Sequence, residues 1–198
     1  MNLVEKIYEG IKEFIDLFIT KYEYENRGMI KKIRIDSRLN LNIEEEKWSR
    51  LFLYKSCYNY CAKIIMLRYL EDNKLTYVKM NKNGFGKWKE FVKNISERFS
   101  LLYNVAIMDL QEDKNNKIRN IFKSSEYDLF KVDDELASLL YKKFSEVDFS
   151  NLKEKDICSI FRKIYSLEKR EELNLEKFYK RAPAFFYLLR LEENERIL

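Results

Sequence analysis

WSRLFLYKSCYNYCAKIIMLRYLED, the stretch from Trp48 to Asp72, decides the fold, because it is long enough for a central helix and apolar around most of that helix. On a helical wheel at about 100° per residue, one broad face carries the larger apolar side chains: Leu53, Tyr54, Cys57, Tyr58, Cys61, Ile64, Ile65 and Leu67. A narrow polar strip is made of Lys55, Asn59 and Lys63. A helix of this kind packs against several neighbours. We therefore predict a buried central helix over about residues 43–72.

Polar residues mark the ends of this helix, and one arginine lies inside its apolar face. Asn42 followed by Glu45 has the pattern of a capping box, and Asn73-Lys74 is the expected end. An unpaired buried guanidinium is costly, so Arg68 either pairs with a carboxylate or extends to the surface. Two interpretations of Arg68 stay open: a structural ion pair, and an arginine that faces phosphate or a protein partner.

The composition favours an all-α fold. The 198 residues include only 4 Gly and 1 Pro, too few for the many turns of a β-sandwich or barrel, and the apolar residues recur with a helical period. With 46% hydrophobic residues the chain has enough material for a core. We predict a single bundle-like helical domain over residues 1–198, to which a C-terminal helical appendage over 175–198 could belong.

The apolar spacing predicts further helices on both sides of the central one. An amphipathic helix over residues 3–22 precedes a basic connection, 27–38, that includes a short extended piece, and another helix is expected over 88–110. Three shorter helices are predicted downstream: around 118–122, behind a cap at Asp133 or Asp134, and behind a capping box of Asn151 with Glu154. Pro183 predicts a break ahead of the apolar run 185–189, which is either a docked final helix or an exposed partner surface.

The chain contains no histidine, which excludes whole classes of catalytic and metal sites. Ser-His-Asp and Cys-His nucleophiles, zinc sites with histidine and histidine acid–base catalysis are ruled out. Cys57, Cys61 and Cys158 are too few for a disulfide scaffold, and buried core thiols explain them better than half a metal site. Neither a membrane span nor a signal peptide is indicated. We expect a soluble, cytoplasmic protein without metal or cofactor.

The positive charge gathers in one segment. The net charge is +5, and residues 73–93 alone hold six lysines against one acid, Glu90. Asparagines and glycines at 81–86 predict a flexible basic loop over 73–89 in which aromatic residues alternate with lysines. Because lysines contact phosphates and aromatics stack on bases, we predict a nucleic-acid or partner contact by these residues: Lys74, Lys79, Lys82, Lys87, Trp88, Lys89 and Lys93. The alternative is a solvated loop with Phe85 and Trp88 turned into the core.

Two stretches resemble the N-terminal helical region of bacterial adenine-N6 DNA methyltransferases of the restriction-modification type. AKIIMLRYLEDNKL, residues 62–75, is similar to a helix that reads "LRyLED" in those enzymes. VDFSNLKEKDICSIFRKIYSLEKREELNL, residues 147–175, is similar to the stretch that leads into their catalytic domain. In that second stretch the match is loose, and it is carried by Phe149-Ser150, Asp156, Ile160-Phe161 and Arg170.

The departures from that family concern catalysis. Asn174 stands where the family has Gly, and LEKFYKRAP replaces the tyrosine-threonine-proline signature. Neither a Gly-rich S-adenosylmethionine loop nor a [DN]PP[YF] motif occurs in the sequence. The resemblance implies a DNA-handling helical module of a modification or defence system without the enzyme.

Three functional hypotheses follow. The first is a non-enzymatic module that binds DNA or RNA, or a nucleoprotein defence complex, through the basic segment. The second is an inhibitor encoded by a phage or mobile element, of the anti-CRISPR or anti-restriction type, that binds a defence complex by protein contact. Its support is the small size and a composition rich in Lys, Asn, Ile, Tyr and Phe, as AT-rich coding gives. The third, an enzyme, lacks a recognisable site, since the carboxylate pairs Asp133-Asp134 and Glu171-Glu172 are explained by capping or solvation.

Overall fold

The structure is a computed structural model that describes residues 2–23, 27–37, 44–94, 98–166 and 182–192. In these ranges the chain is a single all-α domain of nine α-helices and one 3-10 turn, without a strand. The elements in chain order are α1 (Leu3–Tyr22), α2 (Arg27–Ser37), α3 (Glu45–Asp72), α4 (Lys82–Phe91), α5 (Arg98–Gln111), α6 (Asn116–Phe122), α7 (Asp134–Phe144), η1 (Phe149–Asn151), α8 (Glu154–Ile164) and α11 (Pro183–Glu192). The predicted fold class is confirmed.

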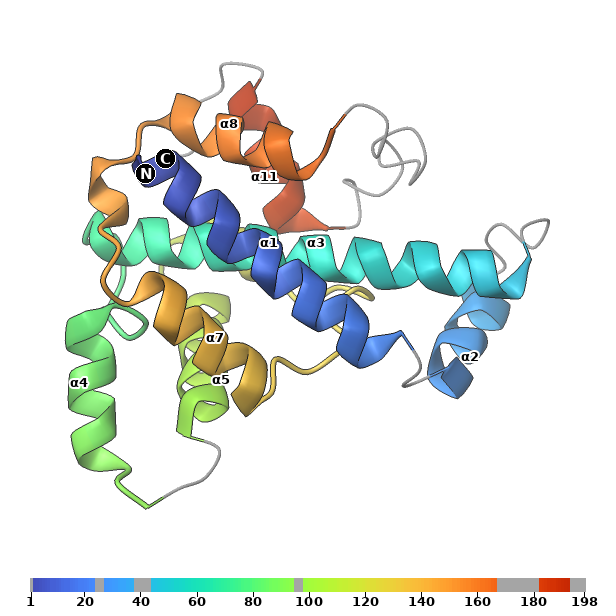
Figure 1. Cartoon of the computed structure of the whole chain (residues 1–198), viewed down its shortest axis with the longest axis horizontal. Helices are drawn as coiled ribbons and strands as arrows, with labels where there is room; N and C mark the ends of the chain where they lie inside the picture. Colours follow the sequence, from blue (N-terminus) through green and yellow to red (C-terminus); the bar gives the residue numbers. More distant parts are fainter. Residues whose placement is uncertain (1, 24–26, 38–43, 95–97, 167–181, 193–198) are drawn as a thin grey trace.

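Helix α3 is the centre of the molecule. It runs along the long axis, with α8 and α11 above it, α5 and α7 below it, and α1 crossing in front of it (Figure 1). Of its 28 residues 18 are buried, as the nearly continuous apolar surface predicts. The helix ends at Asp72 with Asn73 as its C-cap, and Lys74 follows with a left-handed backbone, φ 60°, that reverses the chain. The predicted extent of the central helix is thus confirmed, although Asn42 lies outside the described residues.

Two of the three residues of the polar strip of α3, Asn59 and Lys63, are buried as well, and Lys55 is half-buried. Lys63 Nζ lies 2.6 Å from Asp128 Oδ1, and Asn59 Nδ2 donates to the same oxygen at 2.8 Å. Burial lowers the pKa of Lys63, against the opposing effect of Asp128. The loop between α6 and α7 therefore covers the strip, and Asp128 satisfies two polar groups that would otherwise be desolvated without a partner.

The first and last described helices both pack on this centre. The predicted apolar face of α1 is buried, including Ile7, Ile11 and Phe14, and α1 contacts α3, α7 and α8. Helix α11 begins at Pro183, as predicted, and its Phe185 ring lies 5.2 Å from Phe161. The run 185–188 is therefore docked on α3 and α8, and the exposed-surface alternative does not apply to it.

Three sequence predictions are wrong in detail. Residues 27–37, expected as a connection with an extended piece, form α2. The expected helix over 88–110 is divided into α4 and α5. Helix α8 is capped by Asp156, whose carboxylate accepts the N–H of Lys153 at 2.9 Å, and not by a box of Asn151 with Glu154. The predicted cap at Asp133 is confirmed, since Asp133 accepts the N–H of Leu136.

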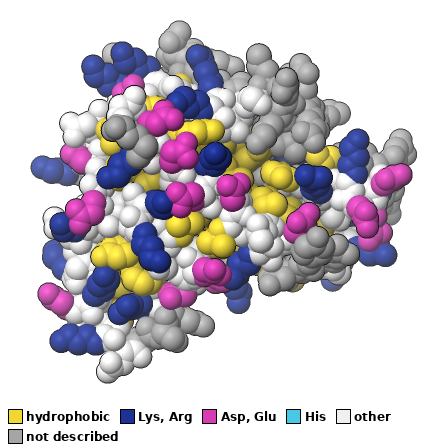
Figure 2. Space-filling view, viewed as in Figure 1, with side chains coloured by type: hydrophobic (Ala, Val, Ile, Leu, Met, Phe, Trp, Pro, Cys, Tyr) yellow, Lys and Arg dark blue, Asp and Glu magenta, His cyan; other side chains and the backbone are white. Residues whose placement is uncertain are grey.

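The described surface mixes both signs of charge. Figure 2 shows Lys and Arg side chains interspersed with Asp and Glu over much of the visible face, and an apolar patch bordered by basic side chains in the region of α4 and α7. None of the described helices is both long enough and apolar enough to cross a membrane.

Candidate nucleic-acid interface

The segment predicted as a flexible basic loop over 73–89 is mostly ordered, and this corrects the prediction. Only residues 73–81 connect α3 to the next helix, because α4 starts at Lys82. The Asn81 side chain caps α4 by accepting the N–H of Gly84 at 3.0 Å. A Cβ on Gly84 would overlap with backbone atoms of Lys79, so the glycine allows the first turn of α4 to pack on the connecting loop. The Asn-Lys-Asn-Gly pattern marks a capped helix start here.

The aromatic residues of α4 have two different roles. Phe85 is buried, with its ring 4.5 Å from that of Tyr141. Trp88 is half-buried, and its Nε1 donates to the carbonyl of Arg98 at 2.5 Å. Phe91 is 84% exposed. Phe85 and Trp88 thus hold α4 on the domain, while Phe91 projects from it.

Three of the predicted basic residues are engaged with the protein itself. Lys79 forms an ion pair with Asp109 at 2.5 Å, and Lys82 pairs with Glu146 at 2.9 Å. Lys89 Nζ donates to the Tyr141 hydroxyl at 2.8 Å and lies over its ring, 4.1 Å from the centroid. The charges of Lys79 and Lys82 are partly neutralised by these pairs, and Lys89 is held in place as an anchor of α4.

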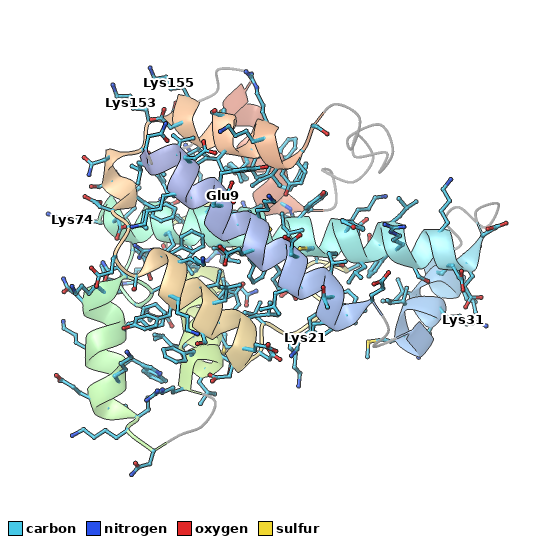
Figure 3. All side chains as sticks on the ribbon, in the orientation of Figure 1. Glu9, Lys21, Lys31, Lys74, Lys153 and Lys155 are labelled. Atoms are coloured by element: carbon cyan, nitrogen blue, oxygen red, sulfur yellow. The ribbon has the colours of Figure 1, made fainter. Side chains whose placement is uncertain are left out.

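The other three lysines are exposed, and in the described ranges they form no ion pair: Lys74, Lys87 and Lys93. Figure 3 places Lys74 at the end of α3, whereas Lys87 and Lys93 follow from α4, which is about 15 Å long at 1.5 Å per residue. These cations are spread along one end of the molecule and are not gathered at one point. On the same side of this view Lys153 and Lys155, at the start of α8, are also exposed, although the charge pattern of the sequence did not indicate them.

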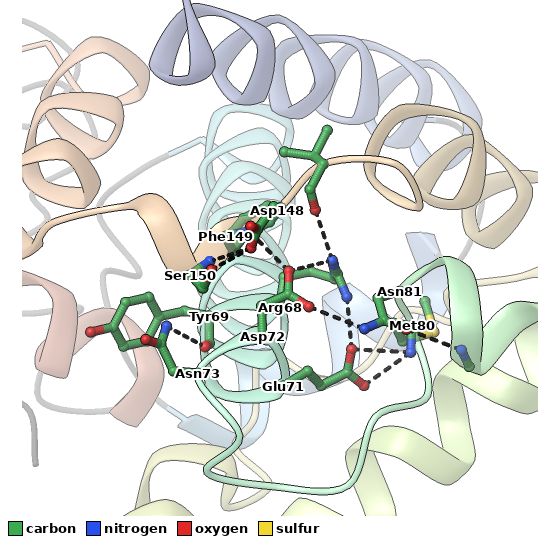
Figure 4. A network of polar contacts seen from close by, with 12 residues as sticks. Arg68, Tyr69, Glu71, Asp72, Asn73, Met80, Asn81, Asp148, Phe149 and Ser150 are labelled. Carbon is green, nitrogen blue, oxygen red and sulfur yellow. Dashed lines mark hydrogen bonds and ion pairs between the residues drawn. The ribbon is translucent and has the colours of Figure 1, made fainter.

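Arg68 does not belong to this exposed group. Its side chain is 2% exposed, with Nη1 at 2.9 Å from Glu71 Oε2 and Nη2 at 2.7 Å from Asp72 Oδ2. Nη2 also donates to the carbonyl of Val147 at 3.0 Å. Of the two interpretations of Arg68, these contacts fit the structural ion pair (Figure 4).

Glu71 extends the same network to the connecting loop. Its carboxylate accepts the backbone N–H of Lys79 at 2.8 Å and that of Met80 at 2.9 Å. Burial raises the pKa of Glu71, and the Arg68 guanidinium and the two N–H groups oppose this effect. The carboxylate therefore fastens the loop, and with it the start of α4, to the end of α3 (Figure 4).

The two stretches that carry the methyltransferase resemblance meet in this network. Asp72 of the first stretch accepts the N–H of Phe149 in the second at 2.9 Å, and the Arg68 guanidinium lies 5.2 Å from the Phe149 ring centroid. Arg68 and Asp72 of the first stretch thus contact Phe149 of the second inside the fold, whereas Ser150 is exposed.

Among the described residues no group of His, Cys, Asp and Glu side chains could hold a metal ion. Cys57, Cys61 and Cys158 are buried thiols, and burial raises the pKa of Cys57, so that its thiol stays protonated. The core-thiol interpretation of the cysteines fits these observations.

No family model matches this chain. No curated protein and no solved structure is similar enough to count as a match either.

Proposed function

We propose that this chain is a non-enzymatic binding module that contacts nucleic acid with the 73–81 loop and the outer side of α4. The observation that carries the proposal is the exposure of two aromatic rings, Tyr77 at 85% and Phe91 at 84%. No other large hydrophobic side chain in the described part of the chain is as exposed. Exposed rings of this kind cost free energy in water, which favours a function for them in binding.

The cations that accompany these rings support the same proposal. Lys87 lies one helical turn before Phe91, on the same side of α4, and Lys93 follows two residues after it. Neither forms an ion pair with a described residue, so both retain their charge for a ligand. A phosphate backbone along Lys87 and Lys93 would place bases within reach of the Phe91 ring.

Binding should be measured by fluorescence anisotropy with labelled single-stranded DNA, duplex DNA and RNA over a range of salt concentrations. The double variant Lys87→Gln, Lys93→Gln should make the fall of log K with log salt less steep. The slope should decrease in magnitude by about 1.4 on single strands and about 1.8 on duplex DNA. The matched control is Lys153→Gln with Lys155→Gln, which removes the same charge from exposed positions on α8. No binding to any of the three ligands, or an equal effect of both double variants, would refute the proposal.

A second candidate function is contact with a defence complex through protein, as in an anti-CRISPR or anti-restriction inhibitor. It is favoured by the connecting loop, which exposes three apolar side chains within four residues: Leu75, Tyr77 and Val78. Such a loop is suited to a protein pocket as well as to bases. Retention of a purified restriction or CRISPR complex on the immobilised chain, lost with Tyr77→Ser, would support this candidate in preference to the first.

Both candidates assign the chain to a DNA modification or defence setting because of the methyltransferase resemblance. Both are also consistent with a cytoplasmic location, since the three cysteines are buried thiols. Neither candidate includes catalysis.

A further inference from the structure

Helix α5 carries an apolar stripe that no described element covers. Leu101, Val105 and Met108 recur at intervals of four and three residues, and they are 38%, 37% and 59% exposed. The opposite side of α5 packs on α6 and α7 and is buried at Phe99, Leu102, Tyr103, Ala106 and Leu110. The stripe is therefore an outer face of a helix that is apolar on both sides, which indicates a second packing partner.

The charges of α5 oppose its own dipole. The only cation within the helix, Arg98, is its first residue, and the only anion, Asp109, lies in its last turn. Glu112 follows directly after the helix and is exposed. A helix is positive at its N-terminus and negative at its C-terminus, so Arg98 and Glu112 stand at the unfavourable ends, while Asp109 is already paired with Lys79 at 2.5 Å.

We propose that the α5 stripe binds the stripe of a second copy of this chain, with the two α5 helices antiparallel. A two-fold axis near Val105 pairs Leu101 of one copy with Met108 of the other, and the reverse, as an isologous contact requires. The same axis brings Arg98 of each copy beside Glu112 of its partner. Neither residue forms an ion pair with a described side chain within its own copy.

The antiparallel arrangement is favoured because it offsets the charges of Arg98 and Glu112 at once. The N-terminal end of each α5, with Arg98, meets the C-terminal end of the other, where Glu112 follows. A parallel pairing would leave both charges at unfavourable helix ends. The stripe spans only about two helical turns, so we expect a dimer of the small, weak class that forms at micromolar or higher concentration.

The experiment is sedimentation equilibrium of the full chain, without nucleic acid, from low micromolar to near-millimolar concentration. Wild type should show a monomer–dimer equilibrium, and Met108→Glu should weaken dimerisation at least about tenfold. The control is Met29→Glu, which places the same charge at a comparably exposed methionine, 48%, on α2. A wild type that stays monomeric at every concentration, or an equal effect of the two substitutions, would overturn the proposal.

A charge exchange tests the antiparallel geometry separately. Arg98→Glu and Glu112→Arg should each weaken the dimer, because each creates two like-charge contacts across the axis. The double variant should recover most of the affinity, because both pairs are restored with reversed sign. No recovery, with folding verified by circular dichroism for all variants, would refute this arrangement of the two helices.

Discussion

The end of α3 and helix α4 are neighbours in the chain, but their basic residues have opposite environments. Arg68 is buried and paired with two carboxylates of its own helix, Glu71 and Asp72. Lys87 on α4 is exposed and has no ion pair among the described residues. The difference teaches that positive charge alone indicates no binding function. Lys87 also has a carboxylate three residues later, the exposed Glu90, so what separates the two cases is burial: the carboxylates that follow Arg68 are held beside it inside the fold.

The largest effect is expected where a buried charge loses its partner. Glu71→Ala leaves the Arg68 guanidinium without one carboxylate and the N–H groups of Lys79 and Met80 without their acceptor. We expect a loss of about 3–5 kcal/mol in the free energy of unfolding, measured by urea denaturation. Glu90→Ala, at an exposed position of α4, should change it by less than about 0.5 kcal/mol. Similar losses for both variants would contradict the contrast between the two regions.

The same contrast exists within α4, between two phenylalanines. Phe85→Ala empties a buried position against Tyr141 and should cost about 3–5 kcal/mol of unfolding free energy. Phe91→Ala should leave stability within about 0.5 kcal/mol of wild type, since the ring is 84% exposed. If Phe91 is a stacking platform, its replacement should weaken single-strand binding by about fivefold or more while the fold is unchanged. A large loss of stability with Phe91→Ala would mean that the ring packs on the protein.

A smaller pair of effects, of opposite sign, is expected at the two glycines of α4. Gly84→Ala should cost about 1–3 kcal/mol, because its Cβ would overlap with the Lys79 backbone and push α4 away from the loop. Gly86 has nothing within 4 Å of an added Cβ, so Gly86→Ala should stabilise the helix by about 0.5–1 kcal/mol. Thermal unfolding of both variants measures the difference. If both substitutions stabilised the protein, helix propensity and not packing would determine the outcome at position 84.

Periodicity predicted most of the fold, and failed where tertiary packing decides. The long apolar patterns of α1 and α3 required helices, so their extents were predictable. The end of α4 was not predictable, because Val92 adopts a non-helical backbone that no local sequence pattern indicates. Whether Phe91 faces inward also depends on where that break falls.

Only the position of the candidate interface along the chain was predictable. The clustering of lysines could be read from the sequence, but their partners could not, because Asp109 and Glu146 come from α5 and from the turn after α7. The pairing of Arg68 with residues at positions i+3 and i+4 is a local pattern, and so it could be anticipated.

The smallest effect concerns a second carboxylate near the junction of α3 and η1, this time an exposed one. Asp148 accepts hydrogen bonds from the N–H and hydroxyl of Ser150, at 2.9 and 2.6 Å, and these lower its pKa. Because the folded pKa lies below the unfolded value of about 3.9, the ionised group stabilises the fold at neutral pH. That contribution is lost as the pH falls below about 4 and through the folded pKa.

The variant Asp148→Asn should therefore lose less stability than wild type between about pH 5 and pH 3. The measurement is the free energy of unfolding from urea denaturation at each pH. The change should be much smaller than that of Glu71→Ala, because solvent screens an exposed carboxylate. An unchanged pH profile would show that the Ser150 contacts stabilise the neutral and ionised forms of Asp148 equally.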